Sequence, residues 1–212
     1  MNGPDRQVRS GRSRAAARFA VPGGYSIVEL VFVAGTIATA GSMAVPQVRA
    51  SLDDFRTAGA ARYISARLQR ARMDAVIRSA DVGLKVTQTS SGYSFAVYVD
   101  GNRNGVRSTD ILNGTDRQLV APERLFDQFP GVEFGALPGL PSVDPSGTPP
   151  GSDPIRLGSS NFATFSSAGT SSSGSLYIRG PRSTQYVVRI YGQTGKTRVL
   201  KFDLRTWLWK PL

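Results

Sequence analysis

The sequence predicts an α+β fold in which one long amino-terminal helix packs on a carboxyl-terminal head of mostly antiparallel β-sheets. Three observations predict it. An apolar run covers residues 25–45, helical periodicity continues over residues 47–79, and strand-like patterns begin at residue 82. A helix followed by several short strands is typical of the α+β class.

The amino-terminal segment, residues 1–24, is a basic leader with five arginines and one aspartate. The whole chain has a formal net charge of +11, so much of the positive charge lies beyond the leader. A strongly basic chain favours anionic partners, and phospholipid headgroups and nucleic acid both qualify. The charge by itself does not select between them.

The chain contains neither cysteine nor histidine. Disulfides, thiolate chemistry, Ser-His-Asp triads and histidine-containing zinc sites are therefore excluded. A carboxylate- or lysine-based enzyme stays open, but no paired-acid or nucleophile motif stands out. We therefore expect a protein that is not an enzyme and has no cofactor of these classes.

The apolar run from Tyr25 to Val45 contains a single charge, Glu29. As a helix it would span roughly 30 Å, about the thickness of a bilayer core. The preceding arginines predict that the leader stays in the cytoplasm and the head is translocated. An ordinary secretory signal cleaved near Ala38–Ala40 is the alternative. The acid inside the run, and its continuation into a long helix pattern, favour a membrane anchor.

Gly24, the aromatic Tyr25 and the following Ser-Ile-Val-Glu-Leu resemble the prepilin peptidase site of type IV pilins and type II secretion pseudopilins. The resemblance implies cleavage after Gly24 by prepilin peptidase and N-methylation of Tyr25. It makes Glu29 the fifth mature residue and Pro46 a helix-kinking proline. It also implies the bacterial inner membrane and other pilin or pseudopilin subunits as partners.

The role of Glu29 has a physical reason. An isolated carboxylate in a bilayer is costly, so Glu29 would be protonated or unpaired there. In a filament, the terminal amine of a neighbouring subunit can approach it. We therefore expect Glu29 to set the register between subunits while apolar faces pack together.

Beyond the apolar run, Pro46 should kink or open the helix because proline removes one backbone hydrogen bond. Apolar residues then recur at helical spacing, and the helix is expected to end near residue 80. The buried positions would be Ala60, Ile64, Leu68, Ala71 and Ala75. Six arginines on the other faces are expected to be solvated rather than to bind nucleic acid.

The head, residues 81–212, is expected in the periplasm. Its first two strands are Val82–Val86 and Tyr93–Val99, joined by a turn at Ser90–Gly92. Residues 136–154 are rich in proline and glycine and predict an exposed loop, and residues 166–174 predict a flexible connection. The later strands are expected at Val132–Phe134, Asn161–Phe165, Ser175–Arg179, Tyr186–Tyr191 and Arg198–Asp203.

Four short motifs resemble the minor-subunit subgroup of secretion protein H and fimbrial protein T. They are Ala71–Ala75, Asp100–Gly105, Phe165–Gly169 and Gly195–Arg198. These motifs are less specific than the amino-terminal signature. They indicate the subgroup, whereas the signature indicates the superfamily.

The segment after the second strand suggests a calcium loop. Asp100, Asn102, Asn104 and Asp110 supply oxygen ligands, and a glycine stands sixth. The bidentate glutamate expected at the twelfth position is replaced by Ile111. The alternative is a turn in which these side chains bond their own backbone.

The closing segment mixes cations with aromatic residues. Lys196, Arg198, Arg205 and Lys210 could neutralise phosphates, and two tryptophans could stack on bases. The segment also resembles the Gly-Arg-x-Arg tail of DNA-uptake members of the fimbrial group, with Lys196 in place of the first arginine. The alternative is an edge strand with charged outer positions and two packed tryptophans.

Taken together, the sequence predicts a minor pseudopilin of a type II secretion system. The alternative from another functional class is a type IV pilus minor pilin that binds DNA during transformation. A signal-anchored periplasmic protein without a filament role is the third possibility.

Overall fold

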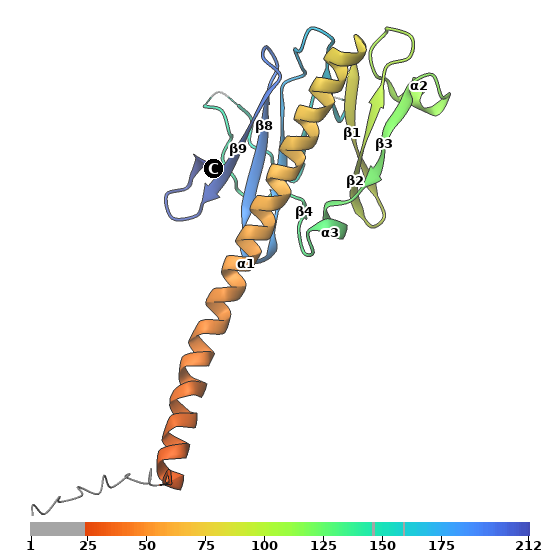
Figure 1. Cartoon of the computed structure of the whole chain (residues 1–212). Helices are drawn as coiled ribbons and strands as arrows, with labels where there is room; N and C mark the ends of the chain where they lie inside the picture. Colours follow the sequence, from red (N-terminus) through yellow and green to blue (C-terminus); the bar gives the residue numbers. More distant parts are fainter. Residues whose placement is uncertain (1–23, 146, 159) are drawn as a thin grey trace, which may run out of the picture. The chain divides into compact units, whose positions relative to one another are not determined.

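The computed structural model describes residues 24–145, 147–158 and 160–212 (Figure 1). It contains one long helix, α1 (Ile27–Arg78), followed by antiparallel sheets, which confirms the α+β prediction. The chain divides into two compact units, one ending at Ala44 and the other running from Val45 to Leu212. The leader expected at residues 1–24 lies outside the described residues except for Gly24.

Within the first unit, α1 is apolar enough and long enough to cross a membrane. Every residue from Gly24 to Leu52 is exposed. An apolar helix without cover in its own chain needs lipid or other helices to remove it from water. The helix at residues 25–45 is therefore suited, by length and composition, to the membrane anchor that the sequence predicts.

Within the second unit, α1 presents a narrow face of small and branched residues to the head. Ala60, Ile64, Leu68, Ala71 and Ala75, which recur at helical spacing, are all buried as predicted. Thr57, Ala58 and Ala61 complete that face. The alanines let the sheets approach α1 closely, and the helix ends at Arg78, near the expected position.

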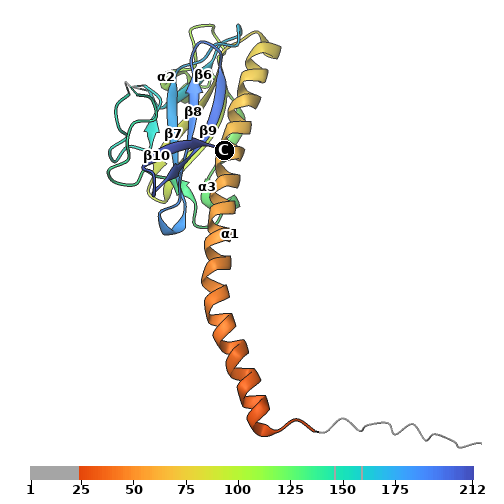
Figure 2. The same ribbon diagram turned by 90° about the vertical axis from the view of Figure 1, so that its left-hand side faces the viewer.

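The four-stranded sheet lies to the right of α1 in Figure 1, and Figure 2 shows the strands of both sheets on the same side of the helix. Its order is β3 (Arg117–Glu123), β2 (Gly92–Val99), β1 (Val82–Thr89) and β6 (Phe162–Phe165). The β1–β2 hairpin turns at residues 90–91, where the sequence predicts a turn. Two short helices, α2 (Ser108–Leu112) and α3 (Leu125–Gln128), flank β3 in the chain.

The six-stranded sheet lies beside the first sheet, to the left in Figure 1 and on the same side of α1 in Figure 2. Its path is β10 (Leu208–Pro211), β9 (Lys196–Asp203), β8 (Gln185–Tyr191), β7 (Gly174–Arg179) and β4 (Glu133–Phe134), and β5 (Ile155–Arg156) also pairs with β7. A single 3-10 turn, η1 (Pro181–Ser183), joins β7 to β8. Side chains from α1 and both sheets form one continuous core.

The proline-rich segment at residues 136–154 is only partly the exposed loop that the sequence predicts. It lies on the face of the six-stranded sheet away from α1 (Figure 2). Leu140 is buried there against Tyr177, Val187, Leu200 and Phe202, in a second small core. Apolar residues spaced among the prolines thus cover a sheet face that would otherwise be exposed.

Candidate functional site

The expected cleavage site lies directly before the helix. Gly24, Tyr25 and Ser26 are non-helical and exposed, and α1 begins at Ile27. Ser26 caps the helix, because its Oγ accepts a hydrogen bond from the Val28 amide at 3.3 Å. Non-helical, exposed backbone is where proteases cut most readily.

Glu29 is the third residue of α1, so it lies within the first turn. Ser26 and Glu29 have the spacing of a capping box, and an acid in the first turn is stabilised by the helix dipole. This local role is one that sequence reasoning missed. Glu29 has no ion-pair partner among residues 24–145, 147–158 and 160–212.

The alternative cleavage site near Ala38–Ala40 is inside α1, more than ten residues from its start. Thr39 donates a hydrogen bond to the Gly35 carbonyl at 2.6 Å, as residues of a continuous helix do. Helical backbone is a poor protease substrate without local unfolding. Pro46 also lies within the residues assigned to α1, and its kink stays a prediction.

The proposed calcium loop is organised by hydrogen bonds to its acids. The buried Asp100 carboxylate accepts three backbone amides, from Asn102 at 3.0 Å, Arg103 at 2.8 Å and Gly105 at 2.7 Å. The same carboxylate oxygens would be needed by a metal ion. The loop therefore has the self-bonded turn geometry that the sequence offers as the alternative.

Asp110 accepts side-chain amides from Asn104 at 2.9 Å and Asn102 at 3.4 Å. The bond from Asn104 is the main reason that the pKa of Asp110 lies below its ordinary value. Across the described part of the chain, no group of three or more acidic side chains is placed to hold a metal ion. Calcium binding by this loop stays a prediction.

The four basic residues of the closing segment do not form one site. Lys196 and Arg198 are exposed near the start of β9, whereas Arg205 lies in the turn beyond its other end and Lys210 lies on β10, opposite Lys201. The first pair lines one pocket and the second pair lines another, and Lys201 is three residues, or roughly 10 Å, along the strand from Arg198. Register places Tyr191 opposite Lys196 and Arg189 opposite Arg198.

The two tryptophans differ. Trp209 packs against Tyr177 and Phe202, and its indole N–H donates to the Pro141 carbonyl at 3.2 Å. Trp207 is about half exposed (52%) and adopts a positive φ of 56° in the β9–β10 turn. The edge strand expected as the alternative is present as β10, and both tryptophans contact Phe202, Trp207 edge-on at 5.2 Å between ring centres while half of it stays exposed.

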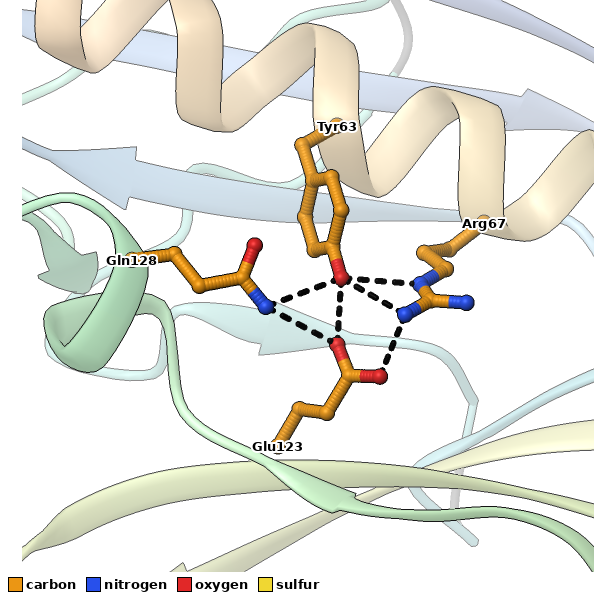
Figure 3. Close-up of polar contacts among 4 residues, drawn as sticks. All are labelled: Tyr63, Arg67, Glu123 and Gln128. Atoms are coloured by element: carbon orange, nitrogen blue, oxygen red, sulfur yellow. Dashed lines mark hydrogen bonds and ion pairs between the residues drawn. The ribbon is translucent and has the colours of Figure 1, made fainter.

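A polar cluster that sequence reasoning missed joins α1 to the head (Figure 3). The Tyr63 hydroxyl donates to Glu123 on β3 and accepts from Arg67 at 2.7 Å and from Gln128 on α3 at 3.0 Å. Arg67 also pairs with Glu123. Burial disfavours the charged guanidinium, but hydrogen bonds with Tyr63 and Glu123 outweigh it and raise the pKa of Arg67. Residues about 60 positions apart give no sequence signal of this kind.

Three of the motifs that carry the subgroup resemblance meet at one point. Arg72 donates to the Gly169 carbonyl at 3.0 Å, and a Cβ on Gly195 would lie 2.5 Å from the same oxygen. Gly169 and Gly195 have φ values of +81° and +61°, which glycine adopts without strain. These motif residues therefore hold the end of α1 against two loops of the head.

No protein-family model, no curated protein and no solved structure matches this chain. A long apolar amino-terminal helix with antiparallel sheets packed on its second half is compatible with a pilin-like fold. The resemblance to pilins therefore rests on the residues of the signature and on this compatibility.

Proposed function

We propose that this protein is a pilin-like structural subunit, and specifically a minor pseudopilin of a type II secretion system. In this proposal prepilin peptidase removes the leader after Gly24, and Tyr25 becomes the N-methylated amino terminus. The helix anchors the precursor in the inner membrane with the head in the periplasm. The mature subunit then joins other pseudopilins in a filament, and its role is structural rather than catalytic.

The observation that carries the proposal is the arrangement at the start of α1. A glycine–aromatic pair is exposed immediately before a capped helix, and one acid lies in the first turn of a fully exposed apolar segment. An uncovered apolar helix is explained by a membrane or by neighbouring helices. In that setting Glu29 can form an ion pair if a neighbouring subunit supplies a positive charge.

Processing is tested by expressing the full chain with a prepilin peptidase and its methylation activity, then measuring the mass of the mature amino terminus. The expected terminus is methylated Tyr25. A terminus near Ser42 would mean ordinary signal cleavage and would refute the proposal. Gly24→Val serves as the control variant, because it should leave the precursor uncut.

Assembly is tested with Glu29→Gln, which keeps the shape of the side chain and removes its charge. We expect normal cleavage and membrane insertion but strongly reduced recovery in sheared filaments. Thr36→Val serves as the matched control. It lies about two helical turns beyond Glu29, and it removes a hydroxyl that donates to the Val33 carbonyl. Normal incorporation of the Glu29→Gln protein would contradict the assembly role.

A second candidate function is DNA capture by a type IV pilus minor pilin. Lys196 and Arg198, with Tyr191, line a cavity of about 580 Å³ at the start of β9. Two cations beside an aromatic ring suit single-stranded nucleic acid, where phosphates pair with cations and bases stack. The Arg189 guanidinium lies 5.8 Å from the Tyr191 ring centre, but it is paired with Asp144, so Lys196 and Arg198 are the cations that this candidate relies on.

Binding of a fluorescent single-stranded oligonucleotide to the detergent-solubilised full chain tests this candidate. Lys196→Ala with Arg198→Ala should weaken binding. It should also make the slope of log affinity against log salt concentration shallower, by the amount expected for the loss of about two phosphate contacts. Arg205→Ala with Lys210→Ala removes the same charge at the other end of β9 and should have little effect. Equal losses in both variants would indicate nonspecific attraction instead of a site.

A further inference from the structure

A second basic pocket, with a volume of about 650 Å³, lies at the other end of the six-stranded sheet from Lys196. One wall is the part of α1 from Gln47 to Asp54, and another is the turn from Arg182 to Gln185. The third wall is the β9–β10 hairpin, including Lys201, Arg205 and Lys210. The sequence analysis names Arg205 and Lys210 in the closing segment, but no sequence motif joins them to Arg182 or to α1.

The charges of the pocket are unequal. Its lining has four cations and two acids, Asp54 and Asp203. Lys201 pairs with Asp54 at 2.8 Å and Lys210 pairs with Asp203, so both lysines are neutralised. The two remaining cations are Arg182 and Arg205.

The two arginines are poorly satisfied. Arg182 lies 3.7 Å from Asp53, a carboxylate that it shares with Arg56 at 3.9 Å. Across the described residues, Arg205 makes no side-chain ion pair. Guanidinium groups present forked donors that match the oxygens of a phosphate. The pocket therefore suits an anion with phosphate chemistry.

The pocket is close along the chain to the end of the apolar run. Arg182 Nη1 lies 3.4 Å from the carbonyl oxygen of Pro46, the residue that follows the run at 25–45. Gln47 to Asp54 continue the same helix, so at 1.5 Å per residue they lie within roughly 15 Å of Val45. The headgroup layer begins where the apolar core ends and is several ångströms thick.

The rim of the pocket has the composition of a membrane interface. Leu204, Trp207 and Leu208, in or next to the β9–β10 turn, are each more than half exposed. Tryptophan beside arginine is typical of the zone between water and the hydrocarbon core. Exposed apolar side chains lie next to Arg205, which has no ion pair among the described residues, and Arg182, which shares the Asp53 carboxylate with Arg56. This combination matches a surface that is acidic and amphipathic.

We propose that this pocket binds the phosphate of an anionic phospholipid headgroup through Arg182 and Arg205. The inference rests on the proposed membrane anchoring by residues 25–45. Trp207 and the two leucines contact the interface around the bound headgroup. The pocket thus holds the segment that follows the apolar run at the bilayer surface before the subunit is extracted for assembly.

The test uses the full chain in a mild detergent with equal amounts of phosphatidylglycerol and phosphatidylcholine, and native mass spectrometry counts the bound lipids. The wild type should retain phosphatidylglycerol preferentially. Arg182→Gln with Arg205→Gln should reduce this preference roughly tenfold, since each basic residue near an anionic surface adds to lipid affinity. Lys196→Gln with Arg198→Gln removes the same charge far from the pocket and should keep the preference.

Several outcomes would overturn the proposal. Equal preference for both lipids in the wild type, or equal loss in both double variants, would mean no specific site. Competition by excess inorganic phosphate at equal potency would mean a site for a free anion. If the double variant unfolds, Arg205→Gln alone is tested in the same way. Arg205 makes no ion pair in the described residues, so this substitution breaks no ion pair and should still lower the preference for phosphatidylglycerol. The mature amino terminus is measured separately, so failure of the pilin proposal and failure of the lipid site give different results.

Discussion

At the residue scale, the closest approach between α1 and the head is at Gly180. A Cβ on this glycine would lie 1.9 Å from Thr57 Oγ1. Thr57 is fully buried, and its hydroxyl already donates to the Asp53 carbonyl at 2.6 Å. The Gly180 backbone therefore packs directly on the Thr57 side chain and leaves no room for a side chain of its own.

We expect Gly180→Ala to destabilise the head by about 1–3 kcal/mol or more, because the added methyl group can only fit if the backbone shifts. Urea unfolding followed by circular dichroism measures the change. Gly59→Ala is the control, since its Cβ would meet only the ring of Phe129, at 3.2 Å, and alanine favours a helix. Unchanged stability of Gly180→Ala would show that this contact is looser than described.

The buried Tyr186 links β8 to α1 by donating its hydroxyl hydrogen to Asp54 at 2.9 Å. Burial, together with the bond to Asp54, raises the pKa of Tyr186 well above its ordinary value. Burial likewise raises the pKa of Tyr93 and Tyr177. The folded state therefore retains phenolic protons that the unfolded chain loses.

Since the unfolded chain binds fewer protons above its own tyrosine pKa of about 10, the free energy of unfolding should fall as pH rises past that value. The contribution is fully present below about pH 10. Tyr186→Phe should cost about 1 kcal/mol at neutral pH and make the alkaline decrease shallower. Denaturant midpoints measured across this pH range check both effects, and an unchanged slope would contradict the assignment.

At the element scale, the cluster of Tyr63, Arg67, Glu123 and Gln128 attaches an edge strand and a short helix to α1. β3 is the outermost strand of its sheet and has a register irregularity against β2. It pairs on one side only, so side-chain contacts to α1 replace the missing neighbour. Tyr63 also packs against Phe129, with ring centres 5.8 Å apart.

Tyr63→Phe should keep the ring packing and remove every hydrogen bond of the hydroxyl. We expect a loss of about 1–2 kcal/mol, because Glu123 and Arg67 remain paired. Hydrogen exchange should accelerate first in β3 and α3 and much less in β8. A uniform increase across both sheets would show that the cluster supports the whole head instead of one edge.

The strands that sequence reasoning predicted are the ones with strong local patterns. β1, β2, β7 and β8 are apolar or alternating, and each pairs on two sides or in a tight hairpin. β3 and β5 were not predicted, and β10 was expected only as the alternative for the closing segment. β3 and β10 contain Pro122 and Pro211, and both are edge strands. Proline cannot donate to a ladder, so its presence argues against a strand unless the edge position is known.

The candidate sites also divide into those formed by neighbouring residues, which the sequence predicts, and those assembled from distant segments, which it does not. Gly24, Tyr25 and Glu29 lie within six residues, so their spacing alone predicts their relation. Arg182 and Arg205 come together only through the folding of β7 to β10, and no local pattern links the two. Conversely, Lys196 and Lys210 belong to one sequence segment, but they lie on neighbouring strands and line different pockets. Local motifs are readable from sequence, whereas sites assembled across a sheet require the fold.

At the scale of the whole molecule, the head has its core entirely within the second unit. The first buried residue of α1 is Thr57, and the buried residues of both cores come from Thr57 onward. The residues from Gly24 to Ala44 contribute no buried side chain. Folding of the head and anchoring by the apolar helix are therefore separate tasks of one chain.

A chain that begins at Val45 should thus fold in water without detergent and show the same thermal midpoint, within a few degrees, as the head of the full chain in detergent. Its unfolding should be a single cooperative transition, because one core includes α1 and both sheets. Scanning calorimetry of the two proteins measures this. A much lower midpoint in the shortened chain, or its failure to fold, would contradict this prediction. Either result would mean that the residues before Val45 stabilise the head although no side chain from Gly24 to Ala44 is buried.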